Sequence, residues 1–158
     1  GMTARAFAAQ YQRKAVGEMF GVDLSKRSDS EMMDSIEYHL FPNMFLFPGV
    51  ALPMIYRFRP NGDDVDSAIF DLLFLRPLTP GEEPPEAPEA FKLGIDDSYE
   101  TVPGIEQWLG FIYDQDTANL DMQQKGFKAS KKPGQTLGDY QEVRVRRLHK
   151  TLHDYLNA

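Results

Sequence analysis

Hydrophobic residues recur every three to four positions near the start of the chain, which is the period of an α-helix. We predict a first helix over residues 3–20, capped at Thr3 and ended by Gly21. Its apolar face consists of Phe7, Tyr11, Ala15 and Met19. A capping-box pattern at Ser28 and Glu31 then predicts a short helical turn.

The middle of the chain alternates between the two faces of β-strands. The predicted strands cover residues 36–40, 44–47, 52–59 and 67–75, with turns at Phe41-Pro42-Asn43, Pro48-Gly49 and Asn61-Gly62. Short turns between successive strands predict an antiparallel meander. Its last strand, residues 67–75, is apolar on both faces and therefore requires cover on both sides.

The remainder of the chain is a loop followed by helices. Residues 77–89 contain five prolines and four glutamates, which predicts a surface loop without helix or inner strand. The helical period returns at about residue 105, and a second capping box at Asp139 and Glu142 predicts a final helix. The predicted inner face of that helix consists of Val145, Leu148, Leu152 and Tyr155. This order predicts an α+β fold, with a long C-terminal helix lying across the sheet.

So small a sheet leaves its outer strands in need of a neighbour or a shield. We therefore expect it to be part of a larger sheet, and we expect the protein to be a homo-oligomer, most simply a dimer. The expected interface includes strand residues such as Ile55, Tyr56, Phe58 or Phe70, or the helical face of Phe7 and Tyr11.

Composition narrows the class of protein. At 158 residues, with 42% hydrophobic residues, the chain is predicted to be one globular domain, 1–158. It has no cysteine, which excludes disulfides and thiolate chemistry within it. Residues 2–10 lack a signal-peptide core, and no apolar run is long enough to span a membrane. We expect a cytoplasmic protein without membrane association.

Charge is unevenly distributed along the chain. Residues 61–121 hold fifteen acids and two bases, whereas residues 125–150 are mainly basic. A basic segment can indicate nucleic-acid binding. The isoelectric point of about 4.9 and the fit of these bases to the polar face of a helix favour a solvated surface or a protein contact instead. We expect no nucleic-acid partner.

Asp116 is the most informative candidate site residue, because it is a carboxylate in a largely apolar helical face. The same face carries Leu109, Ile112, Tyr113, Asn119, Leu120 and Gln123. A buried carboxylate must be neutralised, hydrogen-bonded or bound to a metal. Asp116 is therefore either a metal ligand or a solvent-facing acid at the edge of the apolar stripe.

The three histidines are the other candidate metal ligands. His149 and His153 are four residues apart on the final helix, a spacing that suits a metal. The carboxylates that could join them are Glu142 and Asp154, and Asp154 points elsewhere as the sequence neighbour of His153. A polar flank of that helix is the simpler interpretation, and His39 is interpreted as a sheet-surface or interface residue. A calcium loop in the Asp116 helix is a poor fit, because its sixth and twelfth positions hold Asn119 and Lys125.

Three stretches of the chain combine into a family pattern. They are Tyr38-His-Leu-Phe-Pro-Asn-Met-Phe-Leu-Phe-Pro-Gly49, Ile55-Tyr-Arg-Phe-Arg-Pro-Asn-Gly-Asp63 with Leu73-Phe-Leu-Arg-Pro77, and Gln115-Asp-Thr-Ala-Asn-Leu-x-x-Gln-Gln-x-Gly126. Together with Tyr140-Gln-Glu142 and the terminal helix, they resemble the C-terminal part of the alpha (large) subunit of Rieske-type aromatic-ring-hydroxylating oxygenases. The resemblance runs from about residue 28 to the end.

The resemblance implies a partial helix-grip (START-like) fold, in which an antiparallel sheet packs on a long C-terminal helix. It implies that Asp116 is the carboxylate ligand of a mononuclear Fe2+ whose other two ligands are histidines. In the family those histidines and the Rieske domain lie upstream of the matched part. Without cysteine, this chain cannot hold a [2Fe–2S] cluster.

The function implied is that of a catalytic-domain portion of a dioxygenase, an oxidoreductase of aromatic hydrocarbon catabolism acting on an aromatic or similar apolar molecule. We expect the chain to be inactive alone, with a partner chain supplying the histidines and the Rieske centre. One alternative is a non-catalytic small-molecule binding or interaction module with an apolar helix-grip groove. A degenerate fragment without a present function is the other.

Overall fold

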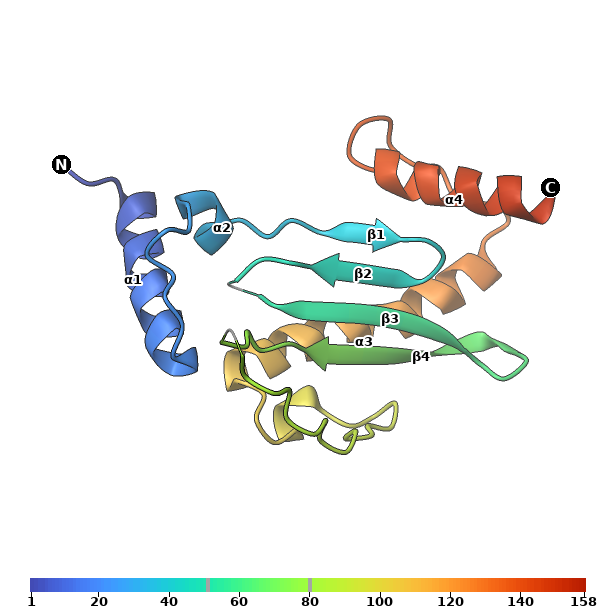
Figure 1. The fold of residues 1–158 in the computed structure, drawn as a ribbon. Coiled ribbons are helices and arrows are strands. Elements are labelled where there is room, and N and C mark those ends of the chain that lie inside the picture. The colour runs from blue at the N-terminus through green and yellow to red at the C-terminus, as the bar shows by residue number, and fades with distance from the viewer. Residues whose placement is uncertain (51, 80) are drawn as a thin grey trace. The chain divides into compact units, whose positions relative to one another are not determined.

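The computed structural model describes residues 1–50, 52–79 and 81–158. Helices and an antiparallel sheet follow one another along the chain, which confirms the α+β class (Figure 1). The elements are α1 (Ala4–Phe20), α2 (Asp29–Met33), β1 (Tyr38–Leu40), β2 (Met44–Phe47), β3 (Met54–Asn61), β4 (Asp64–Phe74), the 3-10 helix η1 (Tyr99–Thr101), α3 (Gln107–Ala129) and α4 (Val143–Leu156).

The chain divides into two compact units. One contains Gly1–Pro85 with Leu152–Ala158, and the other contains Glu86–Thr151. Helices α1 and α2 and the sheet therefore belong to the first unit, and α3 belongs to the second. That the sheet packs on a long C-terminal helix stays a prediction.

The ends of α1 and the start of α2 follow the predicted capping signals. The Thr3 hydroxyl accepts a hydrogen bond from the backbone N of Ala6, and Gly21 ends α1 with a φ of 66°. That left-handed conformation favours glycine because it has no Cβ. Ser28 and Glu31 form the reciprocal bonds of a capping box at α2.

Helix α1 buries a different face from the predicted apolar one. Ala9 and Val16 are buried, and they form a core with Leu24 and Met32. The stripe of Phe7, Tyr11 and Met19 is instead 65%, 67% and 71% exposed. The prediction was wrong because α1 has apolar residues on two faces, and the face with the small Ala9 permits the closer approach of its neighbours. Phe7 and Tyr11 therefore do not shield the sheet.

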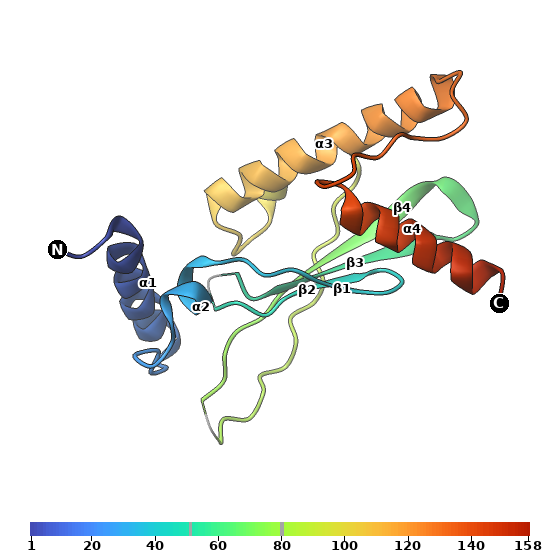
Figure 2. The ribbon, with the colours of Figure 1, turned by 90° about the horizontal axis from the view of Figure 1, so that it is seen from above.

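The four strands form one antiparallel layer in the order β1-β2-β3-β4, which confirms the predicted meander (Figures 1 and 2). Asn61 pairs with Asp64 across the β3–β4 turn, and Gly62 adopts a φ of 60° within it. The strands begin and end within three residues of the predicted bounds, and β4 is longer at its start because the hairpin pairing extends to Asp64.

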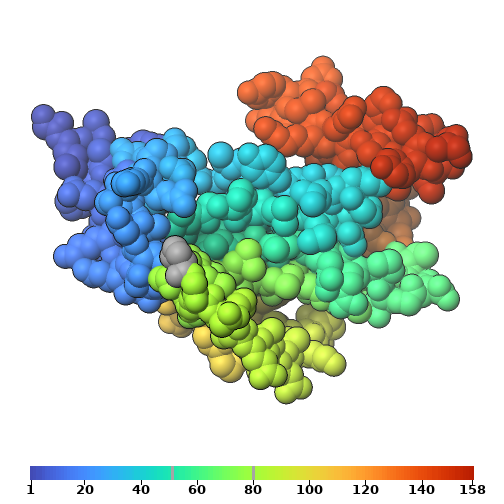
Figure 3. Space-filling view, in the orientation of Figure 1, coloured from blue at the N-terminus to red at the C-terminus, as the bar shows by residue number. Residues whose placement is uncertain are grey.

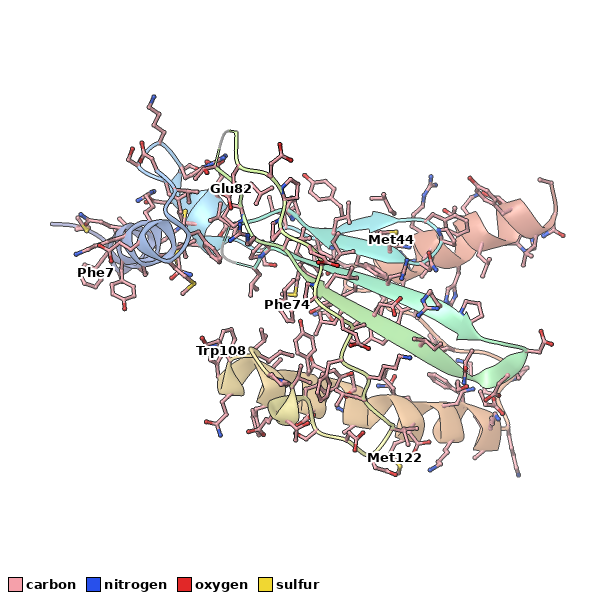
Figure 4. All side chains as sticks on the ribbon, turned by 60° about the horizontal axis from the view of Figure 1, so that its bottom comes forward. Phe7, Met44, Phe74, Glu82, Trp108 and Met122 are labelled. Carbon is pink, nitrogen blue, oxygen red and sulfur yellow. The ribbon has the colours of Figure 1, made fainter. Side chains whose placement is uncertain are left out.

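One face of the sheet is lined by aromatic rings that contact each other across all four strands. His39 stacks on Phe45 at 4.7 Å between ring centroids, and Phe58 stacks on Phe70 at 4.8 Å. Tyr56 meets the edge of Phe70 at 5.2 Å. Such pairs stabilise a sheet by cross-strand contact. We call this the aromatic face; its residues are His39, Phe45, Phe47, Met54, Tyr56, Phe58, Phe70, Leu72 and Phe74 (Phe74 is labelled in Figure 4).

The proline-rich stretch contains neither helix nor strand in its described residues, as predicted. Residues 81–85 of this stretch, which belong to the first unit, are exposed at the molecular surface (Figure 3). One proline of the stretch, Pro80, lies outside the described residues. Arg76 forms an ion pair with Glu82 beside it.

Helix α4 begins at Val143, three residues later than a cap at Asp139 predicts. The Glu142 side chain accepts a hydrogen bond from the backbone N of Gly138, and Arg146 binds Asp139 at 3.0 Å, so these acids hold the preceding turn instead. The predicted inner face of α4 is largely exposed, with only Leu148 half-buried. Its residues Val145, Leu152 and Tyr155 are 41%, 45% and 70% exposed, although Tyr155 does contact the Phe41 ring at 4.7 Å.

In the described part of the chain, no helix combines the length and the hydrophobicity needed to cross a membrane.

Candidate functional site

Helix α3 carries Asp116, and the face of α3 that holds Gly110 and Asp114 is closely joined to η1. Gly110 and Tyr113 are the buried residues of α3. A Cβ on Gly110 would come within 2.9 Å of the backbone N and Cα of Glu100, so only glycine permits this approach. The contact fixes the rotation of α3 relative to the segment that precedes it.

Asp114 makes the polar part of the same contact. Its carboxylate accepts hydrogen bonds from the backbone N of Tyr99 at 2.8 Å and from the Ser98 hydroxyl at 2.5 Å. The Tyr99 ring packs on the Tyr113 ring at 5.4 Å. Burial raises the pKa of Tyr99, a hydrogen bond with Thr117 opposes that shift, and the Asp114 charge adds to it. Asp114 is thus a structural acid.

Asp116 lies three residues after Tyr113, on the same flank of α3, and is exposed. It makes no hydrogen bond or ion pair with any described residue. Its apolar neighbours on that side are also open, with Ile112 38% and Leu120 56% exposed. Among the described residues Asp116 thus faces solvent, and its role as a metal ligand stays a prediction. An exposed carboxylate carries no desolvation penalty and needs no partner.

Asp116 lines neither of two hollows found among the described residues. A groove of about 770 Å³ runs along α1 and the following turn. A second hollow, of about 400 Å³, lies at the end of α3, between Phe127 and Thr136.

The histidines are not assembled into a metal site in the described residues. His39 lies on the aromatic face, stacked on Phe45, and its Nε2 is 3.3 Å from the Pro42 carbonyl oxygen. His149 and His153 are exposed on α4, and His153 contacts Asn157. No group of three histidine, aspartate or glutamate side chains in the described part of the chain could hold a metal ion.

This donor set does not complete an iron site. A 2-His-1-carboxylate centre needs two histidines beside its carboxylate. Asp116 can serve as the carboxylate, but no histidine pair joins it within the described residues. No catalytic step through iron is therefore available to the described residues alone.

Sequence reasoning missed two polar clusters that the structure brings together. One is Ser98, Tyr99 and Asp114, which lie fifteen or sixteen residues apart in the sequence. The other is Arg57 and Arg59, which both bind Asp71 across the β3–β4 pair. Only the second had a sequence signal, because strand alternation places both arginines on one face.

The family comparison agrees with the sequence resemblance and extends it toward the start of the chain. The model described as the ring hydroxylating alpha subunit (catalytic domain) matches residues 4–158. No curated protein and no solved structure shows significant similarity to the chain. Ring hydroxylation is an oxidation, so the family is one of oxidoreductases. A match over almost all of the residues shows that the chain belongs to the family of ring-hydroxylating alpha-subunit catalytic domains.

Proposed function

We propose that the chain is the C-terminal portion of a catalytic domain in a non-haem iron ring-hydroxylating dioxygenase. In this proposal Asp116 supplies the carboxylate ligand of Fe2+. The two histidine ligands and the Rieske centre come from residues outside these 158, in a cytoplasmic assembly. The substrate is an aromatic or similar apolar molecule.

The observation that carries the proposal is the contrast between the two acids of α3. Asp114 is engaged by two hydrogen bonds to Ser98 and Tyr99, whereas Asp116 has no partner among the described residues. Asp116 also lies among exposed apolar residues of the same helix. An unengaged carboxylate on an apolar helical face is suited to binding a cation supplied with further ligands.

The small core supports the proposal that further residues complete the domain. Six hydrophobic side chains are buried among the described residues: Ala9, Val16, Leu24, Met32, Met54 and Tyr113. The aromatic face, the Asp116 side of α3 and the apolar stripe of α4 remain wholly or partly exposed. Exposed apolar surface of this kind marks an interaction or ligand site. We propose that the aromatic face forms part of the apolar substrate pocket.

The first experiment measures iron in the purified chain. We expect far less than one iron per protomer, because a single carboxylate binds divalent iron weakly in water. Stoichiometric iron that is lost in Asp116→Ala would contradict the proposed origin of the histidines. It would instead assign His39, His149 or His153 as a ligand.

The second experiment starts from the coding region just upstream. A reading frame with Cys-x-His, Cys-x-x-His and a paired-histidine helix identifies the partner chain to co-express. The copurified complex should contain mononuclear iron that Asp116→Asn removes. Asp121→Asn is the matched control, because Asp121 is an exposed acid of the same helix that pairs only with Lys125. Full iron in the Asp116→Asn complex would exclude Asp116 as a ligand.

The alternative is a non-catalytic small-molecule binding or interaction module. The described residues do not hold a complete set of metal ligands, which favours this module over an enzyme that is active alone. An upstream region without those cysteine and histidine motifs would support this alternative. It would also leave the aromatic face as the first surface to test for ligands.

A further inference from the structure

Two arginines of β3 converge on one carboxylate of β4. Arg57 and Arg59 are two residues apart, so their side chains leave the same face of the sheet. Arg59 binds both oxygens of Asp71, through Nε at 2.6 Å and Nη2 at 2.9 Å. Arg57 binds Asp71 through Nε alone, at 2.8 Å. The carboxylate is thus shared between two guanidinium groups.

This cluster has a surplus positive charge. Asp71 is ionised at neutral pH, because its pKa is lowered to about 2, chiefly by the hydrogen bonds from Arg59. Partial desolvation opposes that shift, and Arg57 adds to it. Two permanent cations and one anion leave a net charge of +1. The arginine side chains are 44% and 43% exposed, so this charge is accessible.

Arg57 has hydrogen-bond donors that the protein does not use. Its terminal nitrogens, Nη1 and Nη2, make no hydrogen bond with any described residue. A guanidinium presents its donors in a planar fork that matches the two oxygens of a carboxylate. Arg57 can therefore bind a second carboxylate while its Nε stays on Asp71.

An aliphatic strip lies next to this charge on the same face of the sheet. Met44 pairs with Arg57, and the next row along the strands joins Leu46, Ile55 and Leu73, with Tyr38 at its β1 end. Rows two residues apart on a strand are about 6.8 Å from each other, which is close to the length of a benzene ring with one substituent. Leu73 is 41% exposed, and Leu46 and Ile55 are half-buried.

We propose that this arginine face, formed by Arg57, Arg59 and Asp71 with Met44, Leu46, Ile55 and Leu73, binds a small monocarboxylate that carries one ring-sized apolar group. The carboxylate lies on the terminal nitrogens of Arg57, and the apolar group lies on the aliphatic row. A neutral ring would leave the Arg57 fork without an acceptor, and a carboxylate without an apolar group would leave the apolar row uncovered. The proposal is independent of Asp116 and of iron.

The experiment is isothermal titration calorimetry of the purified chain, with benzoate, benzamide and acetate titrated in separate runs. Benzamide has the shape of benzoate without its charge, and acetate has the charge without the ring. We expect benzoate to bind at least about tenfold more tightly than either. Arg57→Met, which keeps an apolar stem, should remove the preference for benzoate over benzamide, and Arg57→Lys should reduce it because the fork is lost.

Arg76→Met is the matched control, because Arg76 is also an exposed arginine in an ion pair with one acid. The control should bind benzoate as the wild-type chain does. Equal binding of benzoate and benzamide would overturn the proposal, as would unchanged benzoate binding in a folded Arg57→Met. Acetate binding as tightly as benzoate would overturn the assignment of the ring to the aliphatic row.

Methyl NMR of the wild-type chain locates the benzoate site without a variant, and so tests the proposal even if Arg57→Met fails to fold. Benzoate should shift the methyl signals of Met44, Leu46, Ile55 and Leu73, and shifts confined to other residues would contradict the site. Self-association that Arg57→Met abolishes would assign the arginine face to an acidic side chain of a second copy, and would also overturn the proposal.

Discussion

Gly110 of α3 lies so close to η1 that a Cβ on it would come within 2.9 Å of the backbone N of Glu100. Gly110→Ala must therefore separate the two segments. We expect the variant to lose about 1–3 kcal/mol of unfolding free energy, the usual cost of overpacking, even though alanine is the better helix former. Urea denaturation followed by circular dichroism measures the loss.

Gly126 provides the control in the same helix. A Cβ there would meet no atom within 4 Å, and its φ is not positive. Gly126→Ala should therefore stabilise the chain by up to about 1 kcal/mol through helix propensity alone. Equal effects at the two glycines would contradict the close packing of α3 on η1.

The two acids of α3 should respond differently to substitution. Asp114→Ala removes the acceptor of the Tyr99 amide and the Ser98 hydroxyl, and should cost about 1–3 kcal/mol of unfolding free energy. Asp116→Ala removes no hydrogen bond within the described residues and should stay within about 0.5 kcal/mol of wild type. Urea midpoints of the two variants, measured side by side, distinguish them. A large loss in Asp116→Ala would give that acid a structural role and weaken its assignment as a ligand.

The Asp71 cluster should make stability depend on pH in a defined window. Its pKa is lowered from 3.8 to about 2 in the folded chain, so the ionised carboxylate favours folding. That contribution is complete above about pH 4 and is lost as the pH falls toward 2. At pH 7, Asp71→Asn should cost about 1 kcal/mol, a value that allows for solvent screening of the exposed arginines.

Urea denaturation of wild type and Asp71→Asn between pH 2 and pH 7 tests this sign. The difference between the two proteins should shrink with falling pH below about 4. Asp63→Asn is the control, because Asp63 makes no hydrogen bond within the described residues and should change stability little at any pH. A difference that grows on acidification would contradict the assignment.

We expect the protein to form a homodimer. On α1, Phe7 and Tyr11 are 65% and 67% exposed, which is the accessible apolar surface that association would bury. Phe7→Ser combined with Tyr11→Ser should weaken association at least about tenfold in sedimentation equilibrium. Val65→Ser, a change of an isolated apolar side chain that is 90% exposed, should have no effect.

A single species of 18.0 kDa at micromolar concentration would contradict self-association altogether. The Phe7→Ser, Tyr11→Ser variant could instead have the same molecular mass in solution as the wild-type dimer. That result would place the interface on the strands, at residues such as Ile55, Tyr56, Phe58 or Phe70.

Local signals predicted most of the elements, because capping and strand alternation act over a few residues. Thr3, Gly21 and the Ser28–Glu31 box mark the helix ends they were expected to mark, and Asn61-Gly62 forms the hairpin turn. The signal at Asp139 and Glu142 failed because Gly138 and Arg146 compete for the same two acids. A local pattern cannot decide between such competing partners.

The sequence by itself determined the class of fold, the strand order of the meander and the position of Asp116 on a helix, since each depends on periodicity or on a short motif. Only the tertiary structure decided which face of α1 is buried, that Asp114 rather than Asp116 is hydrogen-bonded, and that two arginines share Asp71. These outcomes depend on contacts between residues distant in sequence. Whether Ala9 or Phe7 faces α2 is settled by how closely two surfaces can approach, a property that neither segment has alone.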